Sequence, residues 1–177
     1  GLGRLSEVAE MRAMAHAGPH RTLVELKAVD AVHPLVGAVE TEPAGAIAAL
    51  AAGPGRGVLL DSSLLARLRV AVGDTVRIGE ADFTVRGAVT REPDRGTTAI
   101  TLGPPALIRM DDLAATGLVQ PGSLVAWRYR LALPDPAGAK AVAAGLEARH
   151  PDAGWRVRTV ENAAPGLVSF IERLRLY

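Results

Sequence analysis

The chain has 177 residues, of which 49% are apolar and 3% aromatic, and its 20 basic and 19 acidic residues give a formal net charge of +1. This length holds one generous domain or two small subdomains, and the apolar content supports a core without disulfides or metals. The balanced charge argues against a nucleic-acid partner, and the lack of cysteine excludes thiol catalysis and cysteine-ligated zinc.

The first ninety residues predict a strand-rich unit. Residues 5–15 and 22–30 predict two strands around a Gly18-Pro19 turn, and the alternation of the second strand gives it an apolar face on even-numbered residues. The elements expected next are a connector over 31–43, an Ala-rich helix over 43–52, a buried strand over 57–60, a helix over 63–68 capped by Asp61 or Ser62, and hairpin strands over 75–78 and 83–89. The strand, short helix and hairpin over 57–89 suggest a small barrel-like subdomain.

The second half predicts a different pattern. Residues 91–105 are the least regular stretch, and the carboxylates of Asp111 and Asp112 favour the start of a helix that Gly117 ends. The remaining elements expected are a strand over 123–133, an amphipathic helix over 136–149 and a strand over 155–160. The chain therefore ends in a strand-helix-strand unit.

No uninterrupted apolar stretch approaches 18 residues, so no segment of this sequence is expected to span a bilayer. The sequence begins at Gly1 instead of Met, and it stops within an apolar helical pattern over 166–177. We therefore expect it to be a piece of a longer protein.

Candidate chemistry along the chain is sparse. A metal site needs several converging ligands, and His16, His20, His33 and His150 form no pair at helical spacing. The serines lack a nucleophile-elbow context, the glycine-rich run over 53–57 lacks the ending of a phosphate-binding loop, and Asp111 and Asp112 are expected to serve as helix caps. We expect no catalytic, metal or cofactor site.

Six strings carry a resemblance to a known family: VELKAVD over 24–30, PLVG over 34–37, LRVAVGDT over 68–75, REPDRG over 91–96, LAATGLVQPGS over 113–123 and WRYR over 127–130. Together they resemble the YbbP-like group of ABC transporter permeases, which have FtsX-like transmembrane cores and MacB-like periplasmic core domains. The resemblance runs from about Leu5 to Arg173.

The resemblance implies an α+β fold. A porter-like mixed α/β subdomain, truncated at its N-terminus, would comprise residues 1–35 and 124–177, and a small β-rich, barrel-like subdomain over 36–123 would be inserted into it. The intact protein would lie in the inner membrane with this domain on the periplasmic side. The start of the second membrane helix is expected near residues 165–177, with a stalk face formed by Phe170, Ile171, Leu174 and Tyr177. The alternative is a C-terminal helix docked on the surface.

The resemblance also implies a function without catalysis in this domain. A separate cytoplasmic ABC ATPase would drive periplasmic transport or extraction of a hydrophobic or lipid-like substrate, and a lysophospholipase- or thioesterase-like periplasmic hydrolase is a further candidate partner. No cofactor is implied. The alternative function is a free-standing periplasmic binding or adaptor module.

The irregular stretch over 91–105 is the candidate contact region, because long loops often bind partners. Its contact residues would be Ile100, Leu102, Pro104 and Pro105. The alternative is a rigid connector within the barrel-like subdomain.

Overall fold

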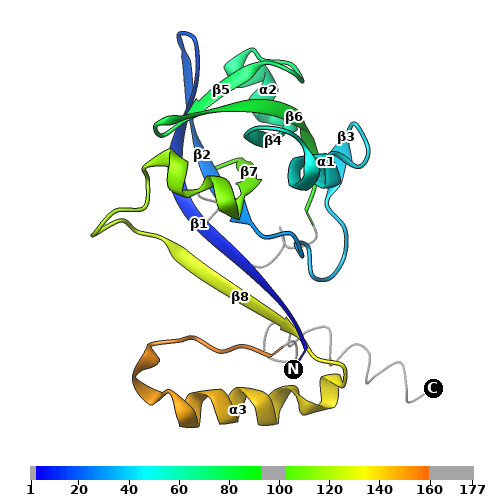
Figure 1. Cartoon of the computed structure of the whole chain (residues 1–177), viewed down its shortest axis with the longest axis vertical. Helices are drawn as coiled ribbons and strands as arrows, with labels where there is room; N and C mark the ends of the chain where they lie inside the picture. The colour runs from blue at the N-terminus through cyan, green and yellow to red at the C-terminus, as the bar shows by residue number, and fades with distance from the viewer. Residues whose placement is uncertain (1–2, 93–102, 160–177) are drawn as a thin grey trace, which may run out of the picture. The chain divides into compact units, whose positions relative to one another are not determined.

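A computed structural model describes residues 3–92 and 103–159 of the chain (Figure 1). The chain divides into two compact units, one formed by Arg4–Leu131 and the other by Gly1–Gly3 together with Ala132–Tyr177. The fold is of the mixed α/β kind predicted from the sequence, and each unit is described separately below.

The larger unit is built on a closed β-barrel. Its six strands are β1 (Arg4–Ala17), β2 (His20–Val29), β4 (Gly57–Asp61), β5 (Thr75–Ile78), β6 (Ala81–Arg91) and β7 (Pro105–Arg109). The strand order is β1-β2-β7-β4-β6-β5, and β5 pairs with β1 to close the ring. The β2–β7 and β4–β6 pairs are parallel and the others antiparallel. The predicted barrel is thus present, but it includes the first two strands of the chain.

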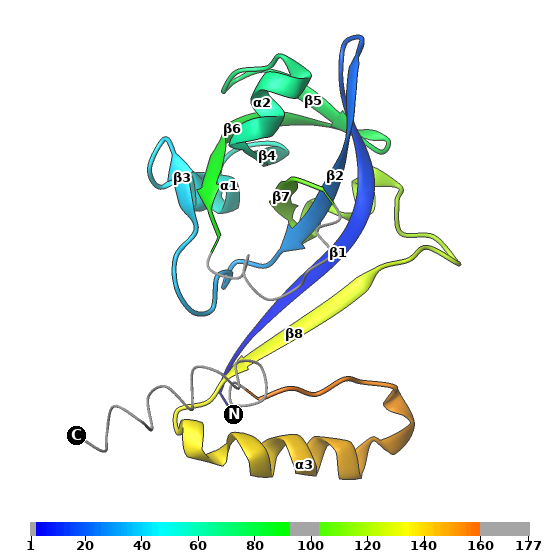
Figure 2. The same ribbon diagram turned by 180° about the vertical axis from the view of Figure 1, so that it is seen from behind.

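Two further strands extend this sheet. β3 (Glu40–Glu42) pairs with β6, and β8 (Ala126–Ala132) lies next to β1 at the end of the strand order. Figures 1 and 2 show β1 and β8 side by side from opposite directions.

The barrel interior is filled by alternate residues of its strands. On β2 the side chains of Val24, Leu26 and Ala28 are fully buried, as the alternation of this strand predicts. On β4 the residues Val58 and Leu60 join the same interior cluster, whereas Leu59 belongs to a second cluster on the outside of the wall. The wall is therefore apolar on both faces over part of its surface, and the outer cluster includes residues of helix α1 (Ala46–Ala52).

Helix α2 (Ser62–Leu68) begins directly after β4 and contributes Leu64 and Leu68 to the interior cluster. Its N-cap is Asp61, whose carboxylate accepts hydrogen bonds from the Ser63 backbone N–H at 3.0 Å and from the Ser63 hydroxyl at 2.6 Å. This satisfies a backbone donor that the first helical turn leaves unpaired, as predicted from the sequence.

The segment after β7 differs from the prediction. Two short 3-10 helices, η1 (Met110–Asp112) and η2 (Ala114–Thr116), take the place of one helix, and Gly117 ends the second with a φ of 64°. Asp112 does not cap a helix: its carboxylate binds the guanidinium of Arg109, with Nε–Oδ2 at 2.8 Å and Nη2–Oδ1 at 3.1 Å. The bidentate ion pair outcompetes the capping role because a guanidinium fork matches both carboxylate oxygens.

The described part of the smaller unit consists mainly of helix α3 (Ala139–Arg149), which follows the 3-10 turn η3 (Pro136–Gly138) and precedes η4 (Pro151–Ala153). The helix was predicted, but none of its residues is buried. The strand predicted over 155–160 was wrong for its described residues: 155–159 form no strand. A β-strand requires a partner for its backbone groups, and the local apolar pattern cannot supply one.

Within residues 3–92 and 103–159, no helix has the length and apolar content needed to cross a membrane. The division of the sequence into 1–35 with 124–177 and 36–123 stays a prediction about subdomains. In the structure, β1 and β2 share one barrel and one core with strands from residues 36–123.

Candidate functional site

Charged side chains gather on the outer face of β1 and β2. Because these strands pair antiparallel with Glu10 opposite Lys27 and Arg12 opposite Glu25, the alternation that buries Val24 and Leu26 turns these four residues outward. Glu10 is nevertheless only 9% exposed. A charge so nearly buried must be compensated by partners.

Lys27 is compensated by a residue far along the chain. Its ammonium group donates to both carboxylate oxygens of Glu92 at 3.1 Å and lies 4.0 Å from the carboxylate of Glu25. The side chains of Lys27 and Glu92 are 13% and 4% exposed. This ion pair links β2 to the residue that directly follows β6.

Among the described residues, an ion pair and a hydrogen bond join β8 to β1. The guanidinium Nε of Arg128 donates to the carboxylate of Glu10, and the Tyr129 hydroxyl donates to Glu7 at 2.8 Å. The bond to Glu7 raises the pKa of Tyr129, because it stabilises the protonated phenol beside a carboxylate. Both contacts link residues more than a hundred positions apart.

Glu25 lies among these groups as the third carboxylate beside two cations. Burial raises the pKa of Glu25, the nearby Lys27 lowers it, Glu10 and Glu92 raise it, and Arg128 lowers it, with a net shift upward from 4.5. We call Glu10, Glu25, Lys27, Glu92 and Arg128 the charged cluster. It holds one more carboxylate than it has cations.

A groove of about 740 Å³ opens beside the charged cluster. It is lined by Glu10, Met11, Arg12, Leu118, Ser123, Leu124, Val125 and Ala126. Leu118 and Val125 pack against the barrel interior, whereas Leu124 is 94% exposed. The groove therefore combines an apolar lining with two charged side chains of β1.

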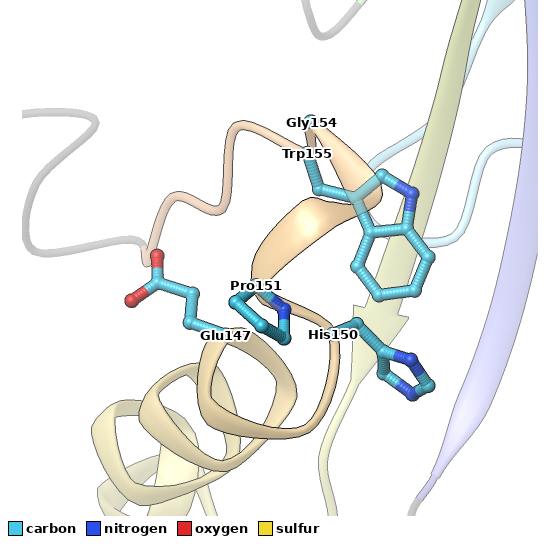
Figure 3. A pocket seen from close by; sticks show the side chains of 5 residues that line it. All are labelled: Glu147, His150, Pro151, Gly154 and Trp155. Atoms are coloured by element: carbon cyan, nitrogen blue, oxygen red, sulfur yellow. The ribbon is translucent and has the colours of Figure 1, made fainter.

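A smaller pocket of about 190 Å³ lies in the second unit (Figure 3). The ring of His150 lies 5.2 Å from that of Trp155 at an angle of 54°, and the carboxylate of Glu147 points away from both rings. These three side chains do not converge on a common point. Among residues 3–92 and 103–159, no group of three or more His, Asp or Glu residues could hold a metal ion.

The residues predicted from sequence as contacts are only partly within the described residues. Pro104 is partly buried, and Pro105 is buried as the first residue of β7, opposite Glu25 of β2. Ile100, Leu102 and the stalk residues Phe170, Ile171, Leu174 and Tyr177 lie outside the described residues. Their roles stay predictions.

The charged cluster was not predicted as a site, although a signal for it was present. Three of the strings that carry the family resemblance meet there: VELKAVD supplies Glu25 and Lys27, REPDRG supplies Glu92, and WRYR supplies Arg128. Their order along the chain gave no indication that they would lie together.

Comparisons with known proteins agree with that resemblance. No protein-family model matches the chain. Over 118 residues, or 66% of its length, the chain is 38% identical to the uncharacterized ABC transporter permease YbbP of Escherichia coli (strain K12). It spans only 14% of that permease.

Two solved structures share the fold. The extracellular domain of the noncanonic ABC-type transporter YknZ from Gram-positive bacteria matches with a TM-score of 0.60 at 11% identity, covering 85% of this chain and 78% of that domain. The periplasmic region of MacB from Actinobacillus actinomycetemcomitans matches with a TM-score of 0.58 at 14% identity, covering 97% and 76%. Identities this low establish the fold alone.

Proposed function

We propose that this chain, a homologue of part of the permease YbbP with the fold of MacB-like periplasmic domains, works as the extracytoplasmic domain of an ABC transporter permease. In this role it transmits movement that originates elsewhere in the transporter. The observation that carries the proposal is the 38% identity to a permease over 118 residues. The shared fold with two domains that lie outside the membrane supports it.

The use of charge in the barrel also fits a mechanical role. Lys27 and Glu92 connect β2 to the end of β6, and Arg128 and Glu10 connect β8 to β1. These charged groups therefore hold neighbouring strands together, which suits a domain that transmits movement.

The partners follow from this proposal. ATP hydrolysis belongs to a separate cytoplasmic ABC ATPase bound to the rest of the permease, and the domain lies on the periplasmic side of the inner membrane. The transported or extracted molecule is hydrophobic or lipid-like. A lysophospholipase- or thioesterase-like hydrolase in the periplasm is a further partner, to be tested by co-purification with the intact permease.

The first test concerns the protein that contains this chain. Its reading frame should encode apolar spans of about 20 residues before Gly1 and after Tyr177, and the protein should fractionate with membranes. In spheroplasts, protease added from outside should digest the domain. A parent protein without both spans contradicts the permease assignment.

The second test concerns the predicted contact residues. Replacing Ile100 and Leu102 with serine should weaken transport by the intact system while the domain stays folded. Val72→Ser is the matched control, because Val72 is an exposed apolar residue of a turn between α2 and β5. Unaltered transport or loss of folding in the double variant rejects the contact role.

The groove beside β1 favours a second candidate, a free-standing periplasmic binding or adaptor module. Its volume of about 740 Å³ is within the usual range for small-molecule sites. The same fractionation separates the two, since a free-standing module is recovered in the soluble periplasmic fraction.

A further inference from the structure

The boundary between the two compact units falls at the start of β1 and within β8. The chain passes from the smaller to the larger unit between Gly3 and Arg4, at the start of β1, and returns between Leu131 and Ala132, within β8. These two strands are neighbours in the sheet and run side by side in both views (Figures 1 and 2). We call them the β1–β8 ribbon.

β8 has less support than the strands of the barrel wall. The ladder between β1 and β2 includes Glu10 and begins at Val8, and just before it the Asp30 carboxylate accepts hydrogen bonds from the Ser6 hydroxyl and the Glu7 N–H. In the described strand order β8 has β1 as its one neighbour. Because β8 is held along one edge only, side-chain contacts from β8 to β1 matter more than they would between two strands of the barrel wall.

The described residues include two contacts of this kind. The Arg128–Glu10 ion pair and the Tyr129–Glu7 hydrogen bond both run from β8 to β1. Of the two accepting residues, Glu7 and Glu10, Glu10 is the one within the β1–β2 ladder, where it lies opposite Lys27. Its side chain is only 10% exposed. Because Lys27 in turn binds Glu92, the contact at Glu10 joins the ribbon to the charged cluster of the barrel.

We propose that Glu10 and Arg128 are positioning residues that stiffen the β1–β8 ribbon, so that displacement of the smaller unit moves the barrel instead of bending the ribbon. The inference rests on the proposed transmission of movement and identifies where in this chain that movement passes. It predicts that breaking the ion pair uncouples the two units without unfolding either.

The experiment measures the separation of the two units in the intact permease assembled with its ATPase. Cysteines introduced at Val72 of the barrel and Ala148 of α3, both exposed, carry spin labels in an otherwise cysteine-free background. Distance distributions are recorded by double electron–electron resonance without nucleotide and after trapping with ATP and vanadate. Thermal melting of each variant checks that the domain stays folded.

Four variants and one control distinguish the effect of the Arg128–Glu10 charge interaction from a general effect on the structure. Arg128→Gln and Glu10→Gln should each abolish most of the nucleotide-dependent change in distance, and the double variant should lose no more, since both remove the same interaction. Arg128→Lys keeps the positive charge and should retain the change. Arg77→Gln is the matched control, because it removes the exposed Arg77–Asp82 ion pair of the barrel, which lies outside the ribbon.

The outcomes distinguish the two proposals. If the distance between the two labels does not change with nucleotide in the protein without further substitutions, the proposed transmission of movement is wrong, and so is the role of the ribbon. If the change is present and survives Arg128→Gln, only the role of the ion pair is overturned. Equal loss in Arg128→Lys and Arg128→Gln also overturns it, since the charge would then be irrelevant.

Discussion

Lys27 and Glu92 are 65 residues apart in the chain, and yet the ammonium group of Lys27 lies 3.1 Å from both carboxylate oxygens of Glu92. Glu92 directly follows the last residue of β6, and Lys27 lies near the end of β2. With Glu10 and Glu25 close by, Lys27 balances a group of carboxylates that are largely shielded from water.

Replacement of Lys27 by methionine should therefore destabilise the larger unit strongly. The variant keeps the apolar stem but removes the cation that binds the buried Glu92 among the described residues, which costs about 2 to 4 kcal/mol of the free energy of unfolding. Urea denaturation followed by circular dichroism measures the change.

Arg77→Gln is the control for this variant. Arg77 and Asp82 are 3.2 Å apart but more than half exposed, so their loss should change the free energy of unfolding by no more than about 0.5 kcal/mol. Equal stabilities of the two variants would show that the buried position of Glu92 has no energetic consequence.

Glu25 should give the domain an unusual pH dependence. Burial raises its pKa in the folded chain above 4.5, so the folded state binds this proton more readily than the unfolded state does. The contribution of Glu25 to stability therefore rises as the pH falls from above the folded pKa towards 4.5. A carboxylate whose pKa is lowered by folding has the opposite pH dependence, since its contribution is lost as the pH falls.

Glu25→Gln removes this titration and should be more stable than the parent chain at pH 7. The gain should shrink as the pH approaches 4.5, because the parent carboxyl is then protonated as well. Glu147→Gln, on the exposed face of α3, controls for the loss of a surface carboxylate. A gain that is constant with pH would contradict the assignment.

The local features of the fold were predictable because their signals are local. The alternation of β2 identifies its buried face, Gly18-Pro19 marks the turn after β1, and Asp61 two residues before Ser63 indicates the N-cap of α2. Each of these features depends on residues within a few positions of one another.

The charged cluster and the closure of the barrel depend on residues that are far apart. The parallel β2–β7 ladder joins Glu25 to Pro105, and Arg128 binds Glu10 across 118 positions. No periodicity in the sequence reports such pairings. The same limit explains the wrong strand at 155–159, where the local pattern suited a strand but no described neighbour pairs with it.

The barrel interior offers a direct test of the core. Leu60 is fully buried, so Leu60→Ala should lower the free energy of unfolding by about 2 to 5 kcal/mol through lost burial and the cavity left behind. Leu124→Ala makes the same change at a side chain that is 94% exposed and should have little effect on urea unfolding. Similar losses at both positions would contradict the assignment of the core.

Alanine substitutions at Gly79 and Gly18 distinguish the cost of backbone strain from the cost of a steric clash. Both have left-handed backbones, with φ of 59° and 54°, so alanine at either position costs about 1 to 2 kcal/mol in conformation. At Gly79 an added Cβ would also lie 2.1 Å from the carbonyl oxygen of Thr116, whereas at Gly18 it would meet nothing within 4 Å. The Glu80 N–H donates to that same carbonyl at 2.8 Å, so the clash must displace η2 from the β5–β6 hairpin. Gly79→Ala should therefore lower the unfolding midpoint in urea clearly more than Gly18→Ala, and equal midpoints would mean that η2 does not depend on this contact.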